Sequence, residues 1–362
     1  MKKIDRYILK KFLTTFFFCI LLMTLVVVVI DISEKTDDFV KSKLGAWRIF
    51  TDYYLHFIPR IDALLFPLFV FIAVIFFTSK MADRTEVVAI LSSGVSFRRF
   101  LLPYWIGGLS LSLLLWAGYH LVLPGANTKW NAFEAKYIPS SLDYSKSFAT
   151  RNYYFRVDSN SYAGMRYFDS VSKSGGNFFI QKFINNQLVY NLRSDMIAWD
   201  TAQKKWKLSG VQERMLAGDK ETVKRTATLF TEYNFKPRDL RVDEFLKDRL
   251  TTPELDDKIA LEKLRGTEGL STLLVERYNR DAIPVSVMIL TLIGAILSSK
   301  KVRGGSGFHL AIGVILSVLY ILFGRFSLVF ATKGNFHPLL AAWIPNMVFG
   351  VLTYYFYRRA AR

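Results

Sequence analysis

The sequence predicts an α-helical polytopic membrane protein with six transmembrane helices, arranged three plus three around an inserted all-β domain. Hydrophobic residues make up 51% of the 362 positions, and six long windows contain no Asp, Glu, Lys or Arg. At about 1.5 Å per residue, each window is long enough to cross, or nearly cross, a hydrocarbon core of roughly 30 Å. These windows are residues 12–30, 63–79, 100–128, 282–299, 304–324 and 334–357.

The order of these windows predicts the domain boundaries. Three windows precede the polar stretch 129–281 and three follow it. We expect an N-terminal transmembrane half at 1–123, a β-rich domain with flanking helical segments at 124–281, and a C-terminal transmembrane half at 282–362. The first window is too long and too apolar for a typical signal peptide, so we interpret it as a retained helix.

The polar stretch has mostly strand-like patterns. Residues 153–157 alternate apolar and polar side chains, and residues 178–192 have the pattern of a hairpin. Residues 206–211 and 226–233 add further strands, while residues 253–281 return to a helix-like composition. Short strands without helical periodicity predict an antiparallel sandwich or an open, jelly-roll-like domain.

The distribution of basic residues favours cytoplasmic N- and C-termini. Segments 1–11, 80–99, 300–303 and 358–362 together hold 15 Lys and Arg against three acids, whereas loop 31–62 has five against six acids. Short loops rich in Lys and Arg stay on the cytoplasmic side of a membrane. We therefore predict that the central domain lies outside the cytoplasm.

Composition and motifs argue against several classes of function. The net charge of +18 is concentrated at the ends of apolar windows, which favours membrane lipid over nucleic acid as the partner. The chain has no P-loop motif and no Ser/His/Asp or Cys/His grouping. Its one cysteine, Cys19, and its four scattered histidines give no metal-ligand spacing. We expect no catalysis, no cofactor and no metal centre.

The connection at residues 80–99 predicts a short amphipathic helix along the membrane surface. Val87, Ile90 and Leu91 repeat at helical spacing, and two acids lie one turn apart on a more polar side. Gly94 suits the end of such a helix. The design combines apolar residues that could seat in a groove with an acid that could pair with a basic partner.

Five short stretches, which form four motifs in chain order, carry a resemblance to a known family. They are Ile4–Ile8, Arg84–Ala89 with Ser93–Ser96, Lys300–Gly305 and Ala342–Asn346. In this order, on a three-plus-three topology, they resemble the YjgP/YjgQ permeases. This family comprises LptF and LptG, the membrane subunits of the lipopolysaccharide-export ABC transporter. The resemblance covers the whole chain, and the opening motif is more similar to the LptG branch.

The resemblance implies a non-catalytic permease subunit in the bacterial inner membrane. Such a subunit extracts lipopolysaccharide and passes it to a periplasmic bridge protein of β-jelly-roll fold, on the way to the outer membrane. The implied partners are a homologous permease subunit, a cytoplasmic ATPase dimer, lipopolysaccharide and membrane lipids, with no nucleic acid. ATP hydrolysis is expected in the separate ATPase subunit.

The resemblance also implies that the segment at about 80–98 is a coupling helix, which docks on the ATPase. Glu86 falls on the family's acidic coupling position, with Asp83 and Arg84 beside it. We predict that these three residues carry the contact. Without the resemblance, Glu86 is simply a solvated charge close to the lipid headgroups.

Basic residues near the outer ends of the spans form a second candidate site. Lys35, Lys41 and Lys43 follow the first span, and Arg325 lies inside span five, on the outer side of its middle. A charge at the centre of a span is unfavourable by about 2.5–3.5 kcal/mol and usually faces a cavity or a partner. In the family, spans one and five form the lateral openings, and basic residues after span one contact lipid phosphates. We predict lipid-head binding at all four residues; alternatively, Arg325 snorkels to the interface and the lysines are solvated.

Two other functions remain open at this point. One is a permease for another lipid or for lipoproteins, although lipoprotein-release permeases commonly place their large domain after span one of four. The other is a membrane-anchored periplasmic sensor or assembly factor, which leaves segment 80–99 unexplained. Co-purification of an ATPase distinguishes a transporter from a sensor, and the bound glycolipid then distinguishes the two transporters.

Overall fold

The protein was analysed as a computed structural model, which forms two compact units. The helical unit comprises residues 1–133, 247–255 and 271–362, and the β unit comprises residues 134–246 and 256–270. Within them, the structure describes residues 2–138, 153–169, 172–185, 187–217, 220–237, 240, 246–265, 269–300, 305–334 and 336–360. Part of the motif at Lys300–Gly305, residues 301–304, lies outside the described residues.

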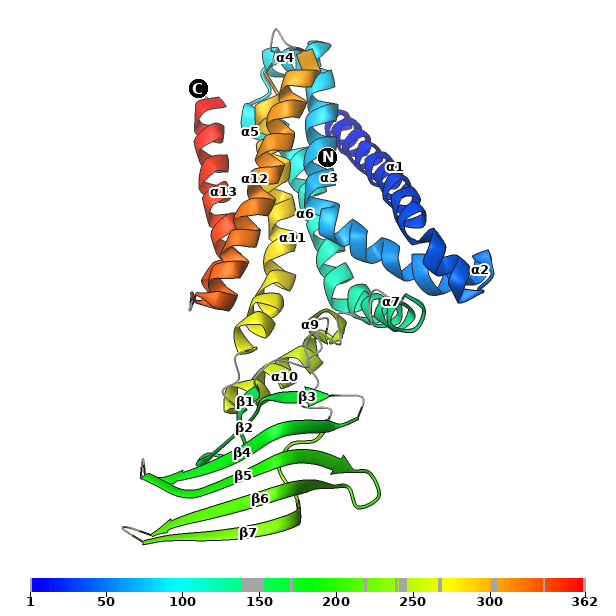
Figure 1. Ribbon diagram of the computed structural model, residues 1–362. Helices are drawn as coiled ribbons and strands as arrows, with labels where there is room; N and C mark the ends of the chain where they lie inside the picture. Colours follow the sequence, from blue (N-terminus) through cyan, green and yellow to red (C-terminus); the bar gives the residue numbers. More distant parts are fainter. Residues whose placement is uncertain are drawn as a thin grey trace. The chain divides into compact units, whose positions relative to one another are not determined.

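Among the described residues, six helical segments are apolar and long enough to cross a membrane (Figure 1). They confirm the predicted helical membrane protein with an inserted β domain. These segments are Lys3–Ser42, Ala46–Asp83, Phe97–Tyr137, Leu270–Ser298, Ala311–Lys333 and Pro338–Ala360.

Several of these segments are built from more than one element. Two of them contain a π-helical turn, named η1 and η2, of the kind that often marks functional positions. The described helices are α1 (Lys3–Ser42), α2 (Ala46–Ile49), η1 (Phe50–Tyr54), α3 (Leu55–Asp83), α4 (Glu86–Ser92), α5 (Phe97–Phe100), α6 (Leu102–Ala117), η2 (Gly118–Val122), α7 (Leu123–Tyr137), α9 (Leu246–Arg249), α10 (Thr252–Arg265), α11 (Leu270–Ser298), α12 (Gly305–Lys333) and α13 (Pro338–Ala360).

The helix α1 continues well past the charge-free window 12–30. It runs through the polar residues that follow and ends at Ser42, where Lys43 adopts a left-handed conformation with φ 56°. Asp31 and Lys35 form an i,i+4 ion pair, an arrangement that supports a helix. Charged residues therefore lengthen this helix instead of ending it.

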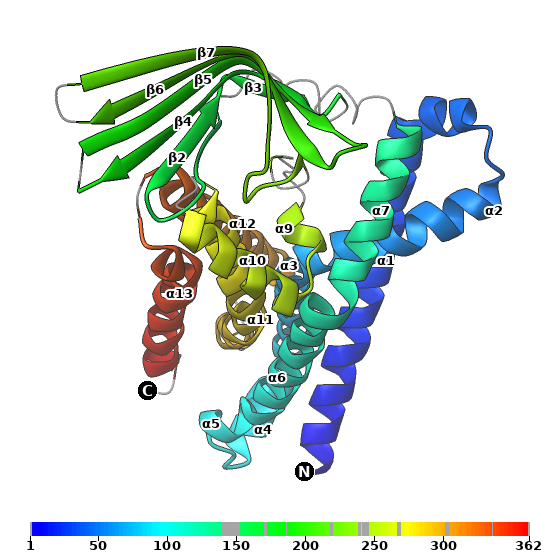
Figure 2. The same ribbon diagram turned by 90° about the horizontal axis from the view of Figure 1, so that it is seen from below.

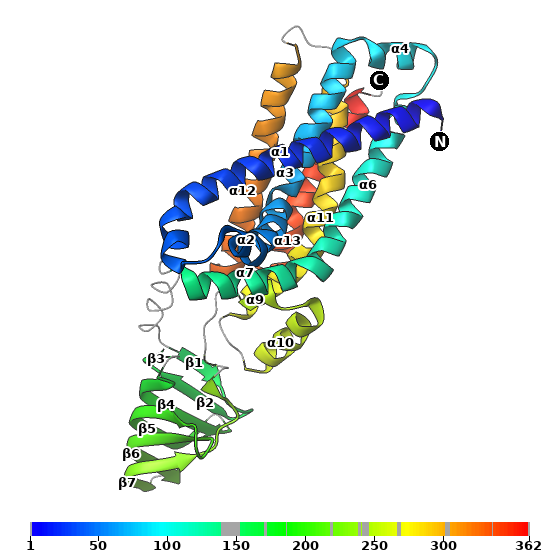
Figure 3. The ribbon, with the colours of Figure 1, turned by 90° about the vertical axis from the view of Figure 1, so that its right-hand side faces the viewer.

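The spans differ strongly in burial. In the most apolar stretches of the second and fourth spans, 61% and 67% of the residues are buried. In those of the first and fifth spans, only 6% and 17% of the residues are buried. The helices α3 and α11 therefore form the centre of the helical unit, and α1 and α12 present open apolar faces. The helix α1 packs obliquely across α3 and α6 (Figure 3).

Close packing of α1 against α6 depends on a glycine. A Cβ atom at Gly107 would lie 2.6 Å from Cε1 of Phe12, closer than real Cβ contacts come. The missing side chain lets the fully buried ring of Phe12 enter the core, 6.2 Å from the ring centre of Tyr104. A small residue at this position thus sets the distance between the two helices.

The β unit contains one antiparallel sheet in the order β1-β2-β4-β5-β6-β7, with β3 paired to β4. The sheet is strongly curved in Figure 2. The described strands are β1 (Tyr153–Arg156), β2 (Ser161–Met165), β3 (Tyr167–Asp169), β4 (Ser174–Ile184), β5 (Gln187–Asp200), β6 (Lys205–Ala217) and β7 (Lys220–Thr231). The predicted hairpin is formed by β4 and β5, and sequence reasoning missed the short strands β2 and β3.

An aromatic core lies on one face of this sheet. Trp206 is completely buried, and its Nε1 donates a hydrogen bond to the carbonyl oxygen of Phe235 at 2.9 Å. The rings of Trp199 and Phe235 lie with their centres 5.1 and 5.3 Å from that of Trp206. Burying the indole with its N–H group satisfied is what allows a tryptophan to occupy the centre of a core.

Candidate functional sites

The segment between α3 and α6 forms a compact turn at one end of the helical unit, here named the α4 end. The helix α4 begins after Thr85, which adopts φ 62°, and ends just before Gly94, which adopts φ 85°. The predicted short helix with its glycine stop is therefore present. Val87 is 1% exposed within the protein's own core, whereas Val88 is 53% exposed. One apolar residue thus anchors α4, and another is available at its surface.

The acidic residue at the start of α4 has a partner on the first helix. Tyr7 Oη donates a hydrogen bond to Glu86 Oε2 at 3.2 Å. Nearby, Arg99 Nη2 forms an ion pair with Oδ2 of the buried Asp5 at 2.5 Å. Both contacts join the beginning of α1 to the segment that carries α4 and α5. The partners are 79 and 94 positions apart, so no local sequence pattern could reveal them.

The two other residues predicted for coupling flank this contact. Asp83 is the last residue of α3 and is partly exposed, and Arg84 follows it with an exposed side chain. Together with Glu86, they place both signs of charge beside Val88 on one short turn. Such a surface suits a partner with a mixed polar and apolar groove.

At the opposite end of α1, Lys35 belongs to a buried polar network. Its Nζ lies 3.2 Å from Asp31 Oδ1 and also donates to Tyr53 Oη. The two phenol groups of Tyr53 and Tyr54 donate to the carboxylate of Asp31 at 3.2 and 3.1 Å. The residues come from α1 and from the π-helical turn η1, which brings two successive tyrosines to the same carboxylate. We name this set the Asp31 network.

Aromatic rings surround the Lys35 ammonium. Nζ lies 4.9 Å from the ring centre of Tyr53 and 5.9 Å from that of Trp130, on α7. The guanidinium carbon of Arg60, on α3, lies 4.0 Å from the same Trp130 ring. Two cations therefore share one indole ring, an arrangement that stabilises each through its π electrons. Lys41 and Lys43 are exposed at the end of α1.

Arg325 lies on α12, at a cavity inside the helical unit. Its side chain is exposed and lines, together with Arg60, a cavity of about 380 Å³ bordered by α3, η2, α7, α9, α11, α12 and α13. Lys35 does not line this cavity, but Arg60 connects the cavity to Trp130 and hence to the Asp31 network. The structure therefore relates Lys35 and Arg325 through a third cation that sequence reasoning did not single out.

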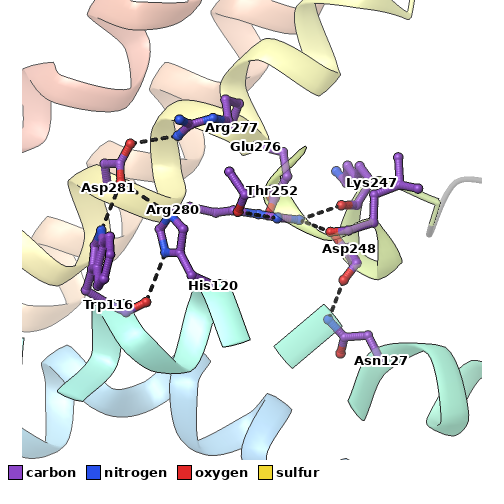
Figure 4. Close-up of polar contacts among 11 residues, drawn as sticks. Trp116, His120, Asn127, Lys247, Asp248, Thr252, Glu276, Arg277, Arg280 and Asp281 are labelled. Atoms are coloured by element: carbon purple, nitrogen blue, oxygen red, sulfur yellow. Dashed lines mark hydrogen bonds and ion pairs between the residues drawn. The ribbon is translucent and has the colours of Figure 1, made fainter. Parts of the chain in front are cut away.

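Sequence reasoning also missed Arg280, a buried arginine on α11 (Figure 4). Its Nη2 donates to the carbonyl oxygens of Lys247 and Leu250, both at 2.9 Å. Nη1 donates to Thr252 Oγ1 at 3.2 Å, and Nε pairs with Glu276 Oε1 at 3.3 Å. The arginine thus fastens the short segment containing α9 to the beginning of the fourth span.

A neighbouring cluster ties the π-helical turn η2 to α11 (Figure 4). The carboxylate of Asp281 accepts hydrogen bonds from Trp116 Nε1 at 3.1 Å and from Arg277 Nη1 at 2.7 Å. Its Oδ1 also lies 3.6 Å from His120 Nε2, and the imidazole stacks on Trp116 with ring centres 4.4 Å apart. These contacts fix the third span against the fourth.

Comparison with known proteins identifies the family of this protein. The sequence matches the model of the lipopolysaccharide export system permease LptF/LptG over residues 6–359. The chain belongs to this family. It is 23% identical over 361 residues to the lipopolysaccharide export system permease protein LptG of Escherichia coli strain K12, which covers 97% of this chain and 96% of the relative. The LptG of Escherichia coli O6:H1 gives the same values.

The LptF/LptG family and the six apolar helical segments indicate the same class of protein. It is a multi-pass inner-membrane protein and a permease subunit of the lipopolysaccharide-export ABC transporter. In this permease, the predicted coupling residues Asp83, Arg84 and Glu86 gather at the α4 end. Of the predicted lipid-head residues, Lys35 lies in the Asp31 network and Arg325 lines the cavity. Arg60 lines the same cavity and also contacts the Trp130 ring beside Lys35.

Proposed function

We propose that this permease extracts lipopolysaccharide from the inner membrane and passes it to a periplasmic bridge protein. It works with a homologous permease subunit and with a cytoplasmic ATPase dimer that hydrolyses ATP. In this proposal the α4 end and both termini are cytoplasmic and the β unit is periplasmic, which the bias of Lys and Arg toward segments 1–11 and 80–99 supports. Similarity to the two LptG proteins favours the LptG side of the family.

One observation carries the proposed mechanism: a single helix joins the two candidate sites. The helix α1 bears Tyr7 and Asp5, which contact α4 and α5, near one end, and Lys35 near the other. At 1.5 Å per residue, Tyr7 and Lys35 are about 40 Å apart along the helix. A push on α4 by the ATPase is therefore applied directly to the helix that carries the lipid-facing lysine.

The lipid head binds, in this proposal, at the cations beyond the opposite ends of the spans. Lipopolysaccharide carries phosphates on its lipid head, and charge-assisted hydrogen bonds from Lys or Arg suit phosphate oxygens. Lys35 and Arg325 make the first contacts, with Lys41 and Lys43 extending the basic surface. The cavity lined by Arg325 and Arg60 supports this assignment, because it places cations beside apolar helix surfaces.

Reversal of charge at Glu86 tests the coupling role. We expect Glu86→Arg to insert and assemble normally and to abolish transport, because like charges across an interface are unfavourable by several kcal/mol. Glu86→Gln keeps an acceptor for Tyr7 and should retain part of the activity. Asp257→Arg makes the same reversal of charge at an exposed position of α10, outside the coupling helix, and is the matched control that should transport normally. Normal transport by Glu86→Arg would remove this residue from the mechanism.

Site-specific crosslinking tests the lipid-head role. A photoreactive amino acid at position 35 or 325 is expected to crosslink to glycolipid in native membranes, whereas one at the exposed position Val351 on α13 should not. A negative result at both 35 and 325 would discard this site and leave the coupling proposal untouched.

A further inference from the structure

Asp31 gives the Lys35 ammonium a fixed negative partner inside the protein. Their side chains are 10% and 20% exposed, with 3.2 Å between Lys35 Nζ and Asp31 Oδ1. Tyr53 and Tyr54 each donate a hydrogen bond to one oxygen of the Asp31 carboxylate. The carboxylate therefore has two donors that do not depend on the lysine.

Any anionic ligand that binds Lys35 has to compete with this carboxylate. Removing the cation from a buried ion pair normally leaves an unpaired charge at high free energy. Here the two phenol groups remain on Asp31 when Lys35 turns away, so the exchange of partners is feasible. The lysine is partly exposed, and its flexible stem with three rotatable donors lets the ammonium reorient toward a ligand.

We propose that Asp31 is a specificity-determining residue, an internal competitor that lets Lys35 bind lipids with a phosphate monoester and excludes lipids with only a phosphate diester. This inference rests on the function proposed above, in which Lys35 meets the lipid head. It assigns to Asp31 a role in choosing the lipid, separate from the role of Lys35 in holding it.

The charges of the two lipid classes supply the reason. A phosphate monoester carries about −1.5 to −2 near pH 7 and presents three acceptor oxygens. A phosphate diester, as in bulk phospholipids, carries a single charge, the same as the carboxylate it would have to displace. Only the monoester therefore gains electrostatic energy when it replaces Asp31 at the lysine.

A second cation reinforces the preference. Arg60 lies against Trp130, the ring that also borders the Lys35 ammonium. A doubly charged phosphate that enters between them meets two cations. Planar guanidinium groups bind phosphate through paired hydrogen bonds, which increases the advantage of the monoester.

Binding of two matched lipids to the full-length protein tests the proposal. Dioleoyl phosphatidic acid carries a monoester and dioleoyl phosphatidylglycerol a diester, on identical acyl chains. The purified chain, with whatever proteins co-purify, is titrated with each lipid in detergent at pH 8 and followed by native mass spectrometry. We expect the wild-type protein to prefer phosphatidic acid by about tenfold or more, as one additional charge-assisted hydrogen bond would give.

Neutralising Asp31 should remove this preference by strengthening the binding of the diester. In Asp31→Asn, which keeps the size and an acceptor for the tyrosines, phosphatidylglycerol should bind nearly as well as phosphatidic acid. Asp37→Asn makes the same charge change at an exposed position of α1 and should leave the ratio at its wild-type value. Inorganic phosphate, added as a competitor, should not displace phosphatidic acid.

The outcomes separate this inference from the proposed function. Equal binding of both lipids to the wild-type protein overturns it and needs no variant that folds. An unchanged ratio in Asp31→Asn, with weaker binding of both lipids to Lys35→Ala, overturns the role of Asp31 and leaves the lipid site in place. Displacement by inorganic phosphate shows a site for free anions and overturns the inference. If Lys35→Ala binds both lipids as the wild type does, the lipid site and the inference both fail.

Discussion

Lys35 and Arg280 are two cations near the ends of spans. Their surroundings differ, and the difference indicates a ligand-binding role for Lys35 and a structural role for Arg280. The partners of Lys35 include the Asp31 carboxylate, the Tyr53 phenol and several ring faces, and its side chain is 20% exposed. Arg280 is 2% exposed and bonds to two backbone carbonyls, a hydroxyl and a carboxylate. The first set can be exchanged for a ligand, whereas backbone carbonyls cannot move away without the chain itself unfolding locally.

The largest effect is expected for removal of the arginine. Arg280→Ala leaves Glu276 without its cation and two carbonyl oxygens without donors, and breaking a buried ion pair in this way typically destabilises by about 3–5 kcal/mol. We expect a clear fall in the thermal unfolding midpoint in detergent and loss of the folded complex in membranes. Arg277→Ala is the control, because Arg277 lies one turn away on the same helix and has a more exposed side chain. Its unfolding midpoint should fall much less.

A stable Arg280→Ala protein would contradict the structural role assigned to Arg280. It would mean that the segment of α9 remains in place through other contacts, such as the hydrogen bond from Asn127 Nδ2 to the Asp248 carbonyl at 2.8 Å. Arg280→Lys sharpens the test. A lysine keeps the charge but not the planar set of donors, so an intermediate loss is expected if geometry as well as charge matters.

The helical framework could be predicted from the sequence because it depends on local composition. Windows without charge gave the six spans, and the glycine at 94 gave the end of α4. Arg280 could not be foreseen in the same way. Two of its partners are backbone carbonyls 33 and 30 positions away, and every residue has a carbonyl, so no pattern of side chains marks them.

The Asp31 network shows a second reason why part of the site was missed. The charges after window 12–30 suggested that the first span ended at Asp31, although the helix continues to Ser42. The helix can continue through this charge because two tyrosines from η1 donate hydrogen bonds to the Asp31 carboxylate. The sequence did indicate Lys35 as a candidate, and Asp31 lies only four positions before it, but the two tyrosine donors to Asp31 could be recognised only in the folded chain.

A smaller effect on stability is expected for Lys35 than for Arg280, with a larger effect on function. Lys35→Ala should destabilise the protein by only about 1 kcal/mol, because Asp31 keeps its two phenol donors. Lipid binding and transport should nevertheless fall strongly. Thermal unfolding and a transport assay on the same preparation measure the two effects. A loss of stability as large as that of Arg280→Ala would show that Lys35 is structural.

The smallest effect is expected for a charge that is fully exposed. Thr251 caps the beginning of α10, and its hydroxyl and amide donate to Glu254 Oε2 at 2.7 and 2.8 Å. These hydrogen bonds, from the hydroxyl first and then the amide, hold the pKa of Glu254 below its ordinary value of 4.5.

The lowered pKa of Glu254 means that the cap stabilises α10 above pH 4.5. This stabilisation is lost as the pH falls through the pKa of the folded state. Hydrogen exchange of the amides of residues 255–258, which begin with the Leu255 amide bonded to the Thr251 carbonyl, should therefore show protection that decreases in acid in the wild type. In Glu254→Gln the protection should be slightly lower at neutral pH and should not change with pH, and the same acid response in both proteins would contradict the assignment of the cap.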